Sequence, residues 1–369
     1  MIPIEVPEDL SGLDEAIAQV PNSPAVFLLW PRAGDPYLAK TALLRRRLLR
    51  LLQEREKPSR LLNLRHTVRR IEYRLTGSAF ESAIEMYELA RRHFPKTYLD
   101  LLKLRMPTYV KLVLTNEFPR SQLTTHLGRA PALYCGPFRS RASAEKFESQ
   151  FLDLFQMRRC QDDLAPSPEH PGCIYGEMGM CQRPCQQVVG RDEYLHEDGR
   201  VAEFLKTGGH SLLDTIERAR DRYSEETMFE EAARQHKRFE KVQDVLKLRD
   251  ELARDIGRLH GVAITPSAAP NAVELGIVRE GHWQAPRRLS FEVQEGKPVS
   301  LDGKLREIFG ALPVRQLATR ERQEYLALLA RWYYSSWRDG EWLPIETFDV
   351  LPYRKLVHAI SRVARRDLP

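Results

Sequence analysis

Apolar positions recur at helical spacing in several long stretches of the chain, and short runs between them have strand character. In the stretch from Thr41, for example, leucines recur at helical spacing between arginines. The predicted helices span residues 41–53, 76–95, 141–157, 212–252, 319–337 and 352–366. Predicted strands cover residues 25–30, 37–40, 108–115 and 130–138, and a β-hairpin is predicted over 272–293 with its turn at Glu280 and Gly281. The opening residues, which show neither helical nor strand spacing of apolar residues, are expected to form a loop.

Local signals divide the chain further. Ser78 is a candidate helix N-cap with Glu81 three residues later, and Pro95 follows the end of that helix. Within residues 212–252 the segment "YSEETMF" separates two apolar helical stretches, which predicts an antiparallel helical hairpin. The stretch "ITPSAAPN" (residues 264–271) is expected to be a linker.

These elements predict an α+β protein. We expect a small mixed-sheet domain at 15–105, a cysteine-containing module at 106–190, a helical hairpin at 191–260, and a C-terminal α+β region of unknown role at 272–369. The 369 residues allow two or three domains, each with its own core.

Charge and hydropathy indicate the kind of partner and the cellular compartment to expect. The net charge is +6, which suits a polyanionic partner. No run approaches the roughly 20 apolar residues of a membrane span, and the acidic opening "MIPIEVPEDL" does not have the order of a signal peptide. We therefore expect a cytoplasmic protein with no membrane partner, in which clustered cysteines remain reduced and favour metal binding over disulfides.

Four of the five cysteines lie within 26 residues, at Cys160, Cys173, Cys181 and Cys185. Four thiolates can close a tetrahedral zinc site or hold a four-iron cluster, and only the last two have the close spacing typical of zinc pairs. The alternative is a set of reduced, buried cysteines that merely pack. The fifth, Cys135, is expected to lie in the core.

The order of motifs resembles the N-terminal half of the UvrC family, the incision subunits of bacterial nucleotide excision repair. The match rests on "YLAKTALLRRRL", "TGSAFESAIE", "EFPR", "LYCGPF", "CIYGEMGMCQRPC" and "MFEEAARQHKRFEKV". It runs from about Pro21 to Leu252, and the cysteine block and the last motif are its most specific parts.

Two implications of the resemblance concern cofactor and partner. The family's cysteine block carries a four-iron cluster, which favours a 4Fe-4S cluster over zinc on the four clustered cysteines. The last motif resembles the UVR hairpin, which pairs with a similar hairpin of UvrB. Phe229, Glu230, Ala232 and Ala233 match its core pattern. An ordinary amphipathic helix is the alternative interpretation.

The resemblance also implies a GIY-YIG endonuclease domain, with departures. The first catalytic tyrosine falls on Phe27, whereas the second is present as Tyr37. Lys40 is retained, and the catalytic arginine falls on Arg47. In this family a tyrosine hydroxyl activates the attacking water, and an arginine stabilises the charge that develops on the phosphate.

The metal-binding glutamate is the larger departure. An alignment without gaps places it at Met86, whose thioether is a poor ligand for Mg²⁺. The family's asparagine falls on Tyr98, and a slip of one residue would restore a glutamate at Glu85. We therefore expect a nuclease scaffold with lost or impaired catalysis, which would use Mg²⁺ or Mn²⁺ only if the site is active.

Basic residues dominate the segment from Lys40 to Arg74. Opposed only by Glu54, Glu56 and Glu72, they are Lys40, Arg45, Arg46, Arg47, Arg50, Arg55, Lys57, Arg60, Arg65, Arg69, Arg70 and Arg74. This excess predicts contact with DNA, centred on Arg45, Arg46 and Arg50, rather than a solvated helix face with alternating signs.

The C-terminal third does not match the family's second nuclease. Its segment "RWYYSSWRDGEW" could stack on nucleic acid, but a packed helix with a buried aromatic face is the favoured interpretation. Three functions remain open: a DNA-binding repair protein with impaired incision, an active metal-dependent endonuclease that makes a single nick, and a UvrB-binding adaptor that does not contact DNA.

Overall fold

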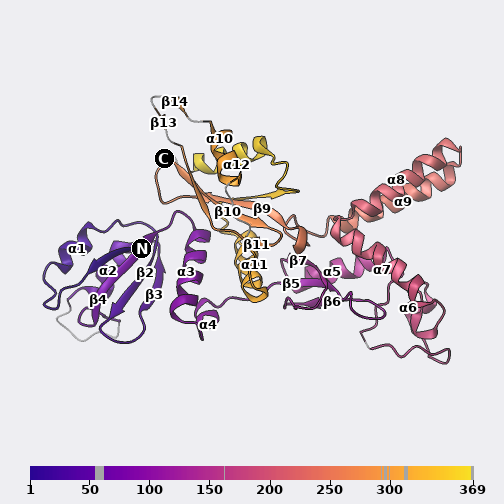
Figure 1. The fold of residues 1–369 in the computed structure, drawn as a ribbon, viewed down its shortest axis with the longest axis horizontal. Helices are drawn as coiled ribbons and strands as arrows, with labels where there is room; N and C mark the ends of the chain where they lie inside the picture. The colour runs from indigo at the N-terminus through magenta and orange to yellow at the C-terminus, as the bar shows by residue number, and fades with distance from the viewer. Residues whose placement is uncertain are drawn as a thin grey trace.

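The computed structural model describes residues 1–54, 62–161, 163–291, 293–294, 297–298, 300–310 and 315–366. In Figure 1 the molecule is elongated, with the N-terminal domain at one end and a long helical hairpin at the other. The C-terminal region lies between them, packed beside both the N-terminal domain and the middle module. The four predicted parts are therefore arranged so that the last part of the chain occupies the centre.

The N-terminal domain is built on an antiparallel sheet with the strand order β1-β4-β2-β3. Its elements are β1 (Ile2–Glu5), α1 (Leu13–Gln19), β2 (Ala25–Pro31), β3 (Tyr37–Thr41), α2 (Leu44–Leu52), β4 (Val68–Leu75), α3 (Ala79–His93) and α4 (Tyr98–Leu102). Strand β2 is buried on both faces because α1 and α2 cover one side and α3 covers the other. The opening is therefore not the expected loop, since β1 forms an edge strand on β4 and α1 follows it.

The middle module combines a second antiparallel sheet, ordered β6-β5-β7-β8, with helices that carry a phenylalanine-rich core. Its elements are β5 (Thr108–Leu112), β6 (Ser121–Thr124), β7 (Leu133–Phe138), α5 (Arg141–Leu152), α6 (Ile174–Glu177), the 3₁₀ turn η1 (Pro184–Gln186), α7 (Arg191–Lys206) and β8 (Arg254–Asp255). Cys135 is fully buried in β7, as predicted.

The predicted helical hairpin is confirmed. It consists of α8 (His210–Glu225) and α9 (Phe229–Leu246), which pack along each other. The buried side chains of the two helices, Leu212, Ile216, Val242 and Val245, all lie near the base of the hairpin. Its distal half therefore projects from the molecule without a core of its own (Figure 1).

The C-terminal region forms a third sheet, ordered β11-β10-β9-β15, with β12 also paired to β10. Its elements are η2 (Ile256–Arg258), β9 (His260–Pro266), β10 (Ala272–Arg279), β11 (His282–Trp283), β12 (Arg287–Ser290), β13 (Val293–Gln294), β14 (Lys297–Pro298), α10 (Leu301–Gly310), α11 (Thr319–Tyr333), β15 (Glu341–Ile345) and α12 (Tyr353–Arg366). Helices α10 and α12 pack on one face of the sheet, and α11 packs on the other.

The prediction of a linker at residues 264–271 is wrong. Ile264 is fully buried inside β9, and residues 267–271 are the turn that joins β9 to β10 in an antiparallel pair. Pro, Ser and Asn suit a hairpin turn as well as a linker, and Asn271 has the positive φ of 51° that such a turn uses. The hairpin predicted around Glu280 and Gly281 is confirmed by the pairing of β10 with β11.

Helix α11 attaches the C-terminal region to the N-terminal domain. Trp332 of α11 is fully buried and stacks on Phe80 of α3, with ring centroids 4.6 Å apart. Asp339, which follows α11, accepts hydrogen bonds from the backbone N–H of Ala79 and from the indole of Trp332. The preferred interpretation of the aromatic segment is therefore confirmed for Trp332. No helix in the described part of the chain is both long and apolar enough for a membrane span.

Candidate nuclease face and cysteine cluster

Two of the expected catalytic residues meet on the N-terminal domain. Arg47 of α2 donates a hydrogen bond from Nη2 to the hydroxyl of Tyr37 on β3, at 3.0 Å. Phe27 lies on the neighbouring strand β2, fully buried, with its ring centroid 6.2 Å from that of Tyr37. The position of the family's first catalytic tyrosine is therefore filled by a packed ring that has no hydroxyl.

Lys40 lies on the other face of the same strand. Side chains alternate along a strand, so Tyr37 and Ala39 face α2, whereas Leu38 joins the core shared with α3. The pKa of Lys40 is lowered by the protein atoms around its ammonium group and by repulsion from Arg331 of α11. Lys40 is thus directed toward the C-terminal region and is separated from the Tyr37–Arg47 pair.

The positions expected to hold a metal are part of the seam between α3 and α11. Met86 packs against the apolar core that joins the two helices. The hydroxyl of Tyr98 donates to Oε1 of the buried Glu324 at 2.6 Å. Tyr87 donates to Oε2 of Glu324 at 2.7 Å, and Nε of Arg320 donates to Oε1. These side chains hold the two parts of the chain together.

Glu85, the residue that a one-residue slip would make the metal ligand, is committed to an ion pair. Its Oε2 lies 2.7 Å from Nη1 of Arg74 on β4. Burial raises the pKa of Glu85, and Arg74 opposes that rise. The carboxylate therefore faces β4 and the C-terminal sheet.

The predicted basic run separates into exposed and structural arginines. Arg45, Arg46 and Arg50 are exposed on α2, and Arg45 also donates to the carbonyl of Val20 at 2.8 Å. By contrast, Arg65 is buried and pairs with Asp14, Arg70 pairs with Glu72, and Arg74 pairs with Glu85. Arg55, Lys57 and Arg60 lie outside the described residues. The basic surface is therefore smaller than the sequence count indicates and is concentrated on α2.

The four clustered cysteines come together in the loops between α5 and α7. Cys173 precedes α6 and is exposed, Cys160 is half-buried, and Cys181 and Cys185 are buried. Burial and, to a smaller extent, repulsion from the other three thiols raise the pKa of Cys181 to about 11. The spacing of the sequence has thus placed four sulfur ligands within electrostatic reach of one another.

In the described part of the chain no group of three or more His, Cys, Asp or Glu side chains is arranged to hold a metal ion.

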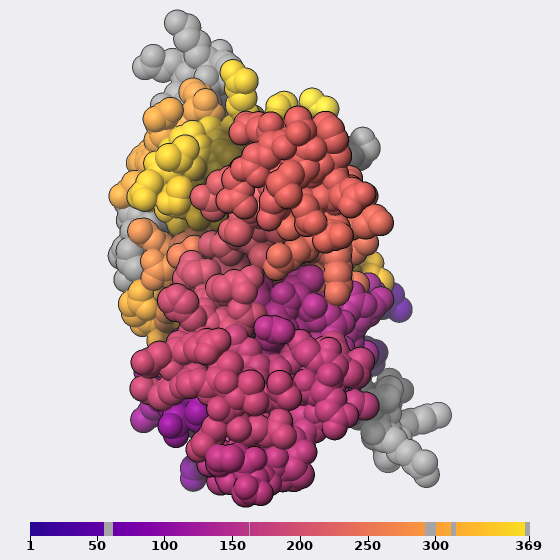
Figure 2. Space-filling view, turned by 90° about the vertical axis from the view of Figure 1, so that its right-hand side faces the viewer, coloured from indigo at the N-terminus to yellow at the C-terminus, as the bar shows by residue number. Residues whose placement is uncertain are grey.

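The hairpin carries an exposed apolar tip. Phe229 is 68% exposed and Met228 is 46% exposed, at the start of α9. Glu230 and Ala233 are exposed on the first turns of the same helix. Figure 2 shows the hairpin and the cysteine module on one side of the molecule. The residues expected to bind a partner are therefore accessible.

Comparison with known proteins agrees with the resemblance. The family model for the UvrC/Cho excinuclease middle domain matches residues 109–206, which include all four clustered cysteines. UvrABC system protein C of Lachnospira eligens is 23% identical over 310 residues, covering 82% of this chain and 50% of that protein. The protein of the same name from Moorella thermoacetica is 27% identical over 291 residues, covering 79% and 45%.

Residues 109–206 thus match the middle domain of the UvrC/Cho excinuclease family, and about four fifths of the chain is similar to UvrABC system protein C. The chain spans about half the length of the curated relatives that it matches. No solved structure matches it significantly.

Sequence reasoning missed the contribution of α11 to this region. Glu324 accepts from Tyr87, Arg331 donates to the carbonyl of Leu102, and Arg320 lies over the ring of Tyr98, so all three reach residues more than two hundred positions earlier in the chain. A glutamate inside an apolar helical face, at Glu324 in "EYLALLA", was the available signal, because a buried carboxylate requires partners.

Proposed function

We propose that this chain is a DNA-binding protein of nucleotide excision repair that carries an iron–sulfur cluster and whose nuclease site no longer cuts. One observation carries the loss of cutting: Phe27, Met86 and Tyr98 are all packed in apolar or hydrogen-bonded cores. These side chains stabilise the domain and supply neither a base for water nor an oxygen ligand for Mg²⁺.

Tyr37 and Arg47 can still bind a phosphate. The guanidinium of Arg47 already hydrogen-bonds the hydroxyl of Tyr37, and its Nε has no other partner in the described residues. The exposed Arg45, Arg46 and Arg50 would contact neighbouring phosphates along the same helix. Binding of DNA can therefore persist after catalysis has been lost.

The likeness to the UvrC family favours a 4Fe-4S cluster over zinc on the four clustered cysteines. Burial and repulsion from neighbouring thiols raise the pKa of Cys181 and of Cys185, so a positively charged group bound there would favour their thiolate forms. Cys160, Cys173, Cys181 and Cys185 would hold the cluster. When bound, it would neutralise the thiolates, cross-link the loops between α5 and α7, and add a redox-active centre.

The hairpin supports a protein partner. An aromatic side chain that is 68% exposed at the tip of a projecting hairpin is the kind of anchor that a docking interface buries. The relatives are named as components of a UvrABC system, and by this likeness the partner would be UvrB. An adaptor without DNA contact would share this hairpin but would not need the exposed arginines of α2.

The test is a rescue of strand incision with Mn²⁺ on damaged duplex DNA in the presence of UvrB. We expect negligible nicking by the wild type and by Met86→Glu, and nicking by Phe27→Tyr/Met86→Glu. A positioned acid–base group alone contributes about 10²- to 10⁴-fold. Adding Tyr37→Phe to the double variant is the matched control and should remove the restored activity.

Strong metal-dependent nicking by the wild type that Glu85→Gln abolishes would contradict the proposal. It would establish the active endonuclease with the glutamate one residue earlier in the helix.

A further inference from the structure

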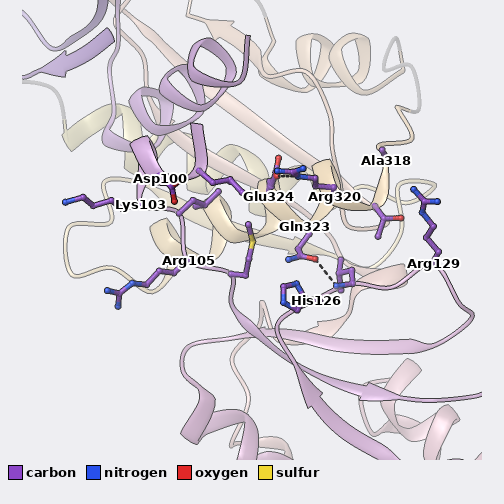
Figure 3. Close-up of a pocket in the computed structure, with 14 residues that line it drawn as sticks. Asp100, Lys103, Arg105, His126, Arg129, Ala318, Arg320, Gln323 and Glu324 are labelled. Atoms are coloured by element: carbon purple, nitrogen blue, oxygen red, sulfur yellow. Dashed lines mark hydrogen bonds and ion pairs between the residues drawn. The ribbon is translucent and has the colours of Figure 1, made fainter. Parts of the chain in front are cut away.

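Two hollows meet beneath α11, where the chain leaves the N-terminal domain. The first, of about 880 Å³, is lined by residues 99–106, the loop after β6 and the first turn of α11 (Figure 3). The second, of about 770 Å³, is lined by the start of α5 and the middle of α11. Lys103, Arg105 and Met106 line both hollows, so the two adjoin the same segment of chain, and together we call them the groove.

Positive charge dominates this groove. Its exposed basic side chains, which we call the seam arginines and lysine, are Lys103, Arg105, Arg129, Arg139, Arg141 and Arg331. Two carboxylates also line it, Asp100 and Glu324. Glu324 is buried and already engaged by Arg320 and two tyrosine hydroxyls, so it does not offset the exposed cations.

Most of these cations lack an acidic partner. In the part of the chain that the structure describes, Lys103, Arg105, Arg129 and Arg139 form no ion pair, whereas Arg141 pairs with Glu145. In Figure 3, Lys103 and Arg105 project at one end of the first hollow and Arg129 at the other. Like charges spread along a groove repel each other unless a polyanion lies between them.

The helix that roofs the groove adds to this charge. The fifteen-residue α11 begins inside the first hollow, and its N-cap residue Ala318 provides no side-chain acceptor for the free N–H groups of the first turn. Such a helix start favours a negatively charged group.

The groove also approaches the N-terminal sheet, on the face opposite the Tyr37–Arg47 pair. Burial lowers the pKa of Lys40 of β3, and repulsion from Arg331, which lines the second hollow, lowers it as well. A track of cations therefore leads from a residue that matches the family's nuclease motif, past residues 103–106, to Arg129. Cations distributed over two hollows suit a chain of phosphates better than one small anion.

We infer that the seam arginines and lysine bind the sugar–phosphate backbone of DNA. This inference rests on the proposed DNA-binding function and assigns part of it to the C-terminal region. Contacts with phosphates release counterions, so each contact that is removed lowers the slope of log affinity against log salt by about 1.

The test uses the full chain and fluorescence anisotropy of a labelled duplex over a range of salt concentrations. Arg105→Gln/Arg129→Gln should weaken binding by tenfold or more near 0.1 M salt and reduce the slope by about 2. The matched control is Arg354→Gln/Lys355→Gln, which removes two exposed charges from α12 on the opposite face of the sheet. It should leave affinity and slope close to wild-type values.

A second readout does not depend on substitutions. Acetylation of lysines followed by mass spectrometry should show that DNA protects Lys103 but not Lys355. Unchanged salt slope in the groove variant, or unprotected Lys103, would overturn the inference. The inference would also be overturned if Arg105→Gln/Arg129→Gln lost binding of inorganic pyrophosphate but bound DNA as the wild type does. That result would identify the groove as a site for a small anion.

These experiments distinguish failure of the groove inference from failure of the proposed DNA-binding function. If Arg46→Glu/Arg50→Glu weakens DNA binding while the groove variant does not, the proposed function stands and the inference is wrong. If the wild type shows no salt-dependent binding to DNA, both are wrong.

Discussion

The cysteine module and the N-terminal domain differ in what holds them together. The N-terminal sheet is covered on both faces, and its strand β2 is buried from Ala25 to Leu29. Among its described residues, the segment that carries the cysteines contains only the four-residue α6 and the three-residue η1, and α6 buries just Gly176. The first region is stable through apolar packing, whereas the second has little packing to rely on.

This contrast explains which chemistry each region retains. Phe27 and Met86 add to the apolar content of the N-terminal cores, so this domain would fold without the catalytic groups that we propose it has lost. If the cysteine loops hold the proposed cluster, its ligation would supply part of their folding free energy, because metal binding is itself folding free energy in such modules.

The largest predicted effect tests this dependence on ligation. Cys181→Ala should abolish the broad absorbance near about 400 nm and the roughly four irons per chain expected of anaerobically purified protein. It should also remove most of the soluble, folded protein, because Cys181 is buried at the centre of the cluster of thiols. Iron analysis, absorbance and soluble yield measure the outcome.

Cys135→Ala is the matched control, since that thiol is buried outside the cluster. It should retain iron and colour. Colourless wild-type protein with one zinc per chain would contradict the iron–sulfur assignment, and a stable, soluble Cys181→Ala protein would show that the loops fold without ligation.

The next effect is on binding alone. Phe229→Ala should weaken capture of UvrB by tenfold or more, as loss of a central aromatic anchor does. It should change the free energy of unfolding by less than about 0.5 kcal/mol, because the side chain is 68% exposed. Surface plasmon resonance and thermal melting measure the two quantities.

Lys237→Ala, exposed on the same helix, should leave both quantities unchanged. Equal capture by wild type and Phe229→Ala would remove the hairpin tip from the partner interface.

Much of the fold could be predicted because local signals and final structure agree. Ser78 caps α3 as its position indicated, accepting from the N–H of Glu81 at 2.9 Å. The two helices of the hairpin and the aromatic helix α11 have the predicted spans to within a few residues. The edge strand β1 was missed, because four residues with one exposed face carry little periodicity.

The site could be predicted only in part, for a physical reason. Tyr37 and Arg47 are close in sequence and do meet. Lys40, however, is directed to the other face by strand alternation, and the partners of Tyr87 and Tyr98 lie on α11, more than two hundred residues away. Local periodicity contains no information about such a long-range pairing.

The smallest predicted effect concerns the packed half of the molecule. Glu81 lies at the start of α3, where its Oε2 accepts from the N–H of Gly77 at 2.7 Å. Burial raises the pKa of Glu81 from 4.5 to about 7, and the nearby Glu274 and Glu85 add to the rise. The N–H of Gly77 and the guanidinium of Arg288 oppose it. The folded state therefore binds a proton that the unfolded chain has released.

The sign of the pH dependence follows from this difference. Well below pH 4.5 both states hold the proton, and Glu81 does not lower the free energy of unfolding. Between about pH 4.5 and 7 the unfolded chain ionises first, so the free energy of unfolding falls as pH rises.

Glu81→Gln keeps an acceptor for the N–H of Gly77 but has no charge. It should match the wild type near about pH 3.5 and exceed its free energy of unfolding by on the order of 2 kcal/mol at pH 8. Urea unfolding of both proteins at several pH values measures this difference, from which the titration of all other groups cancels. Glu15→Gln removes an exposed carboxyl from α1 and should show no such divergence. If the Glu81→Gln and wild-type curves stay parallel from pH 4.5 to 8, the seam beside α3 is open to water, and the contrast between a tightly packed N-terminal half and a ligand-dependent cysteine module would be weaker than the burial of β2 indicates.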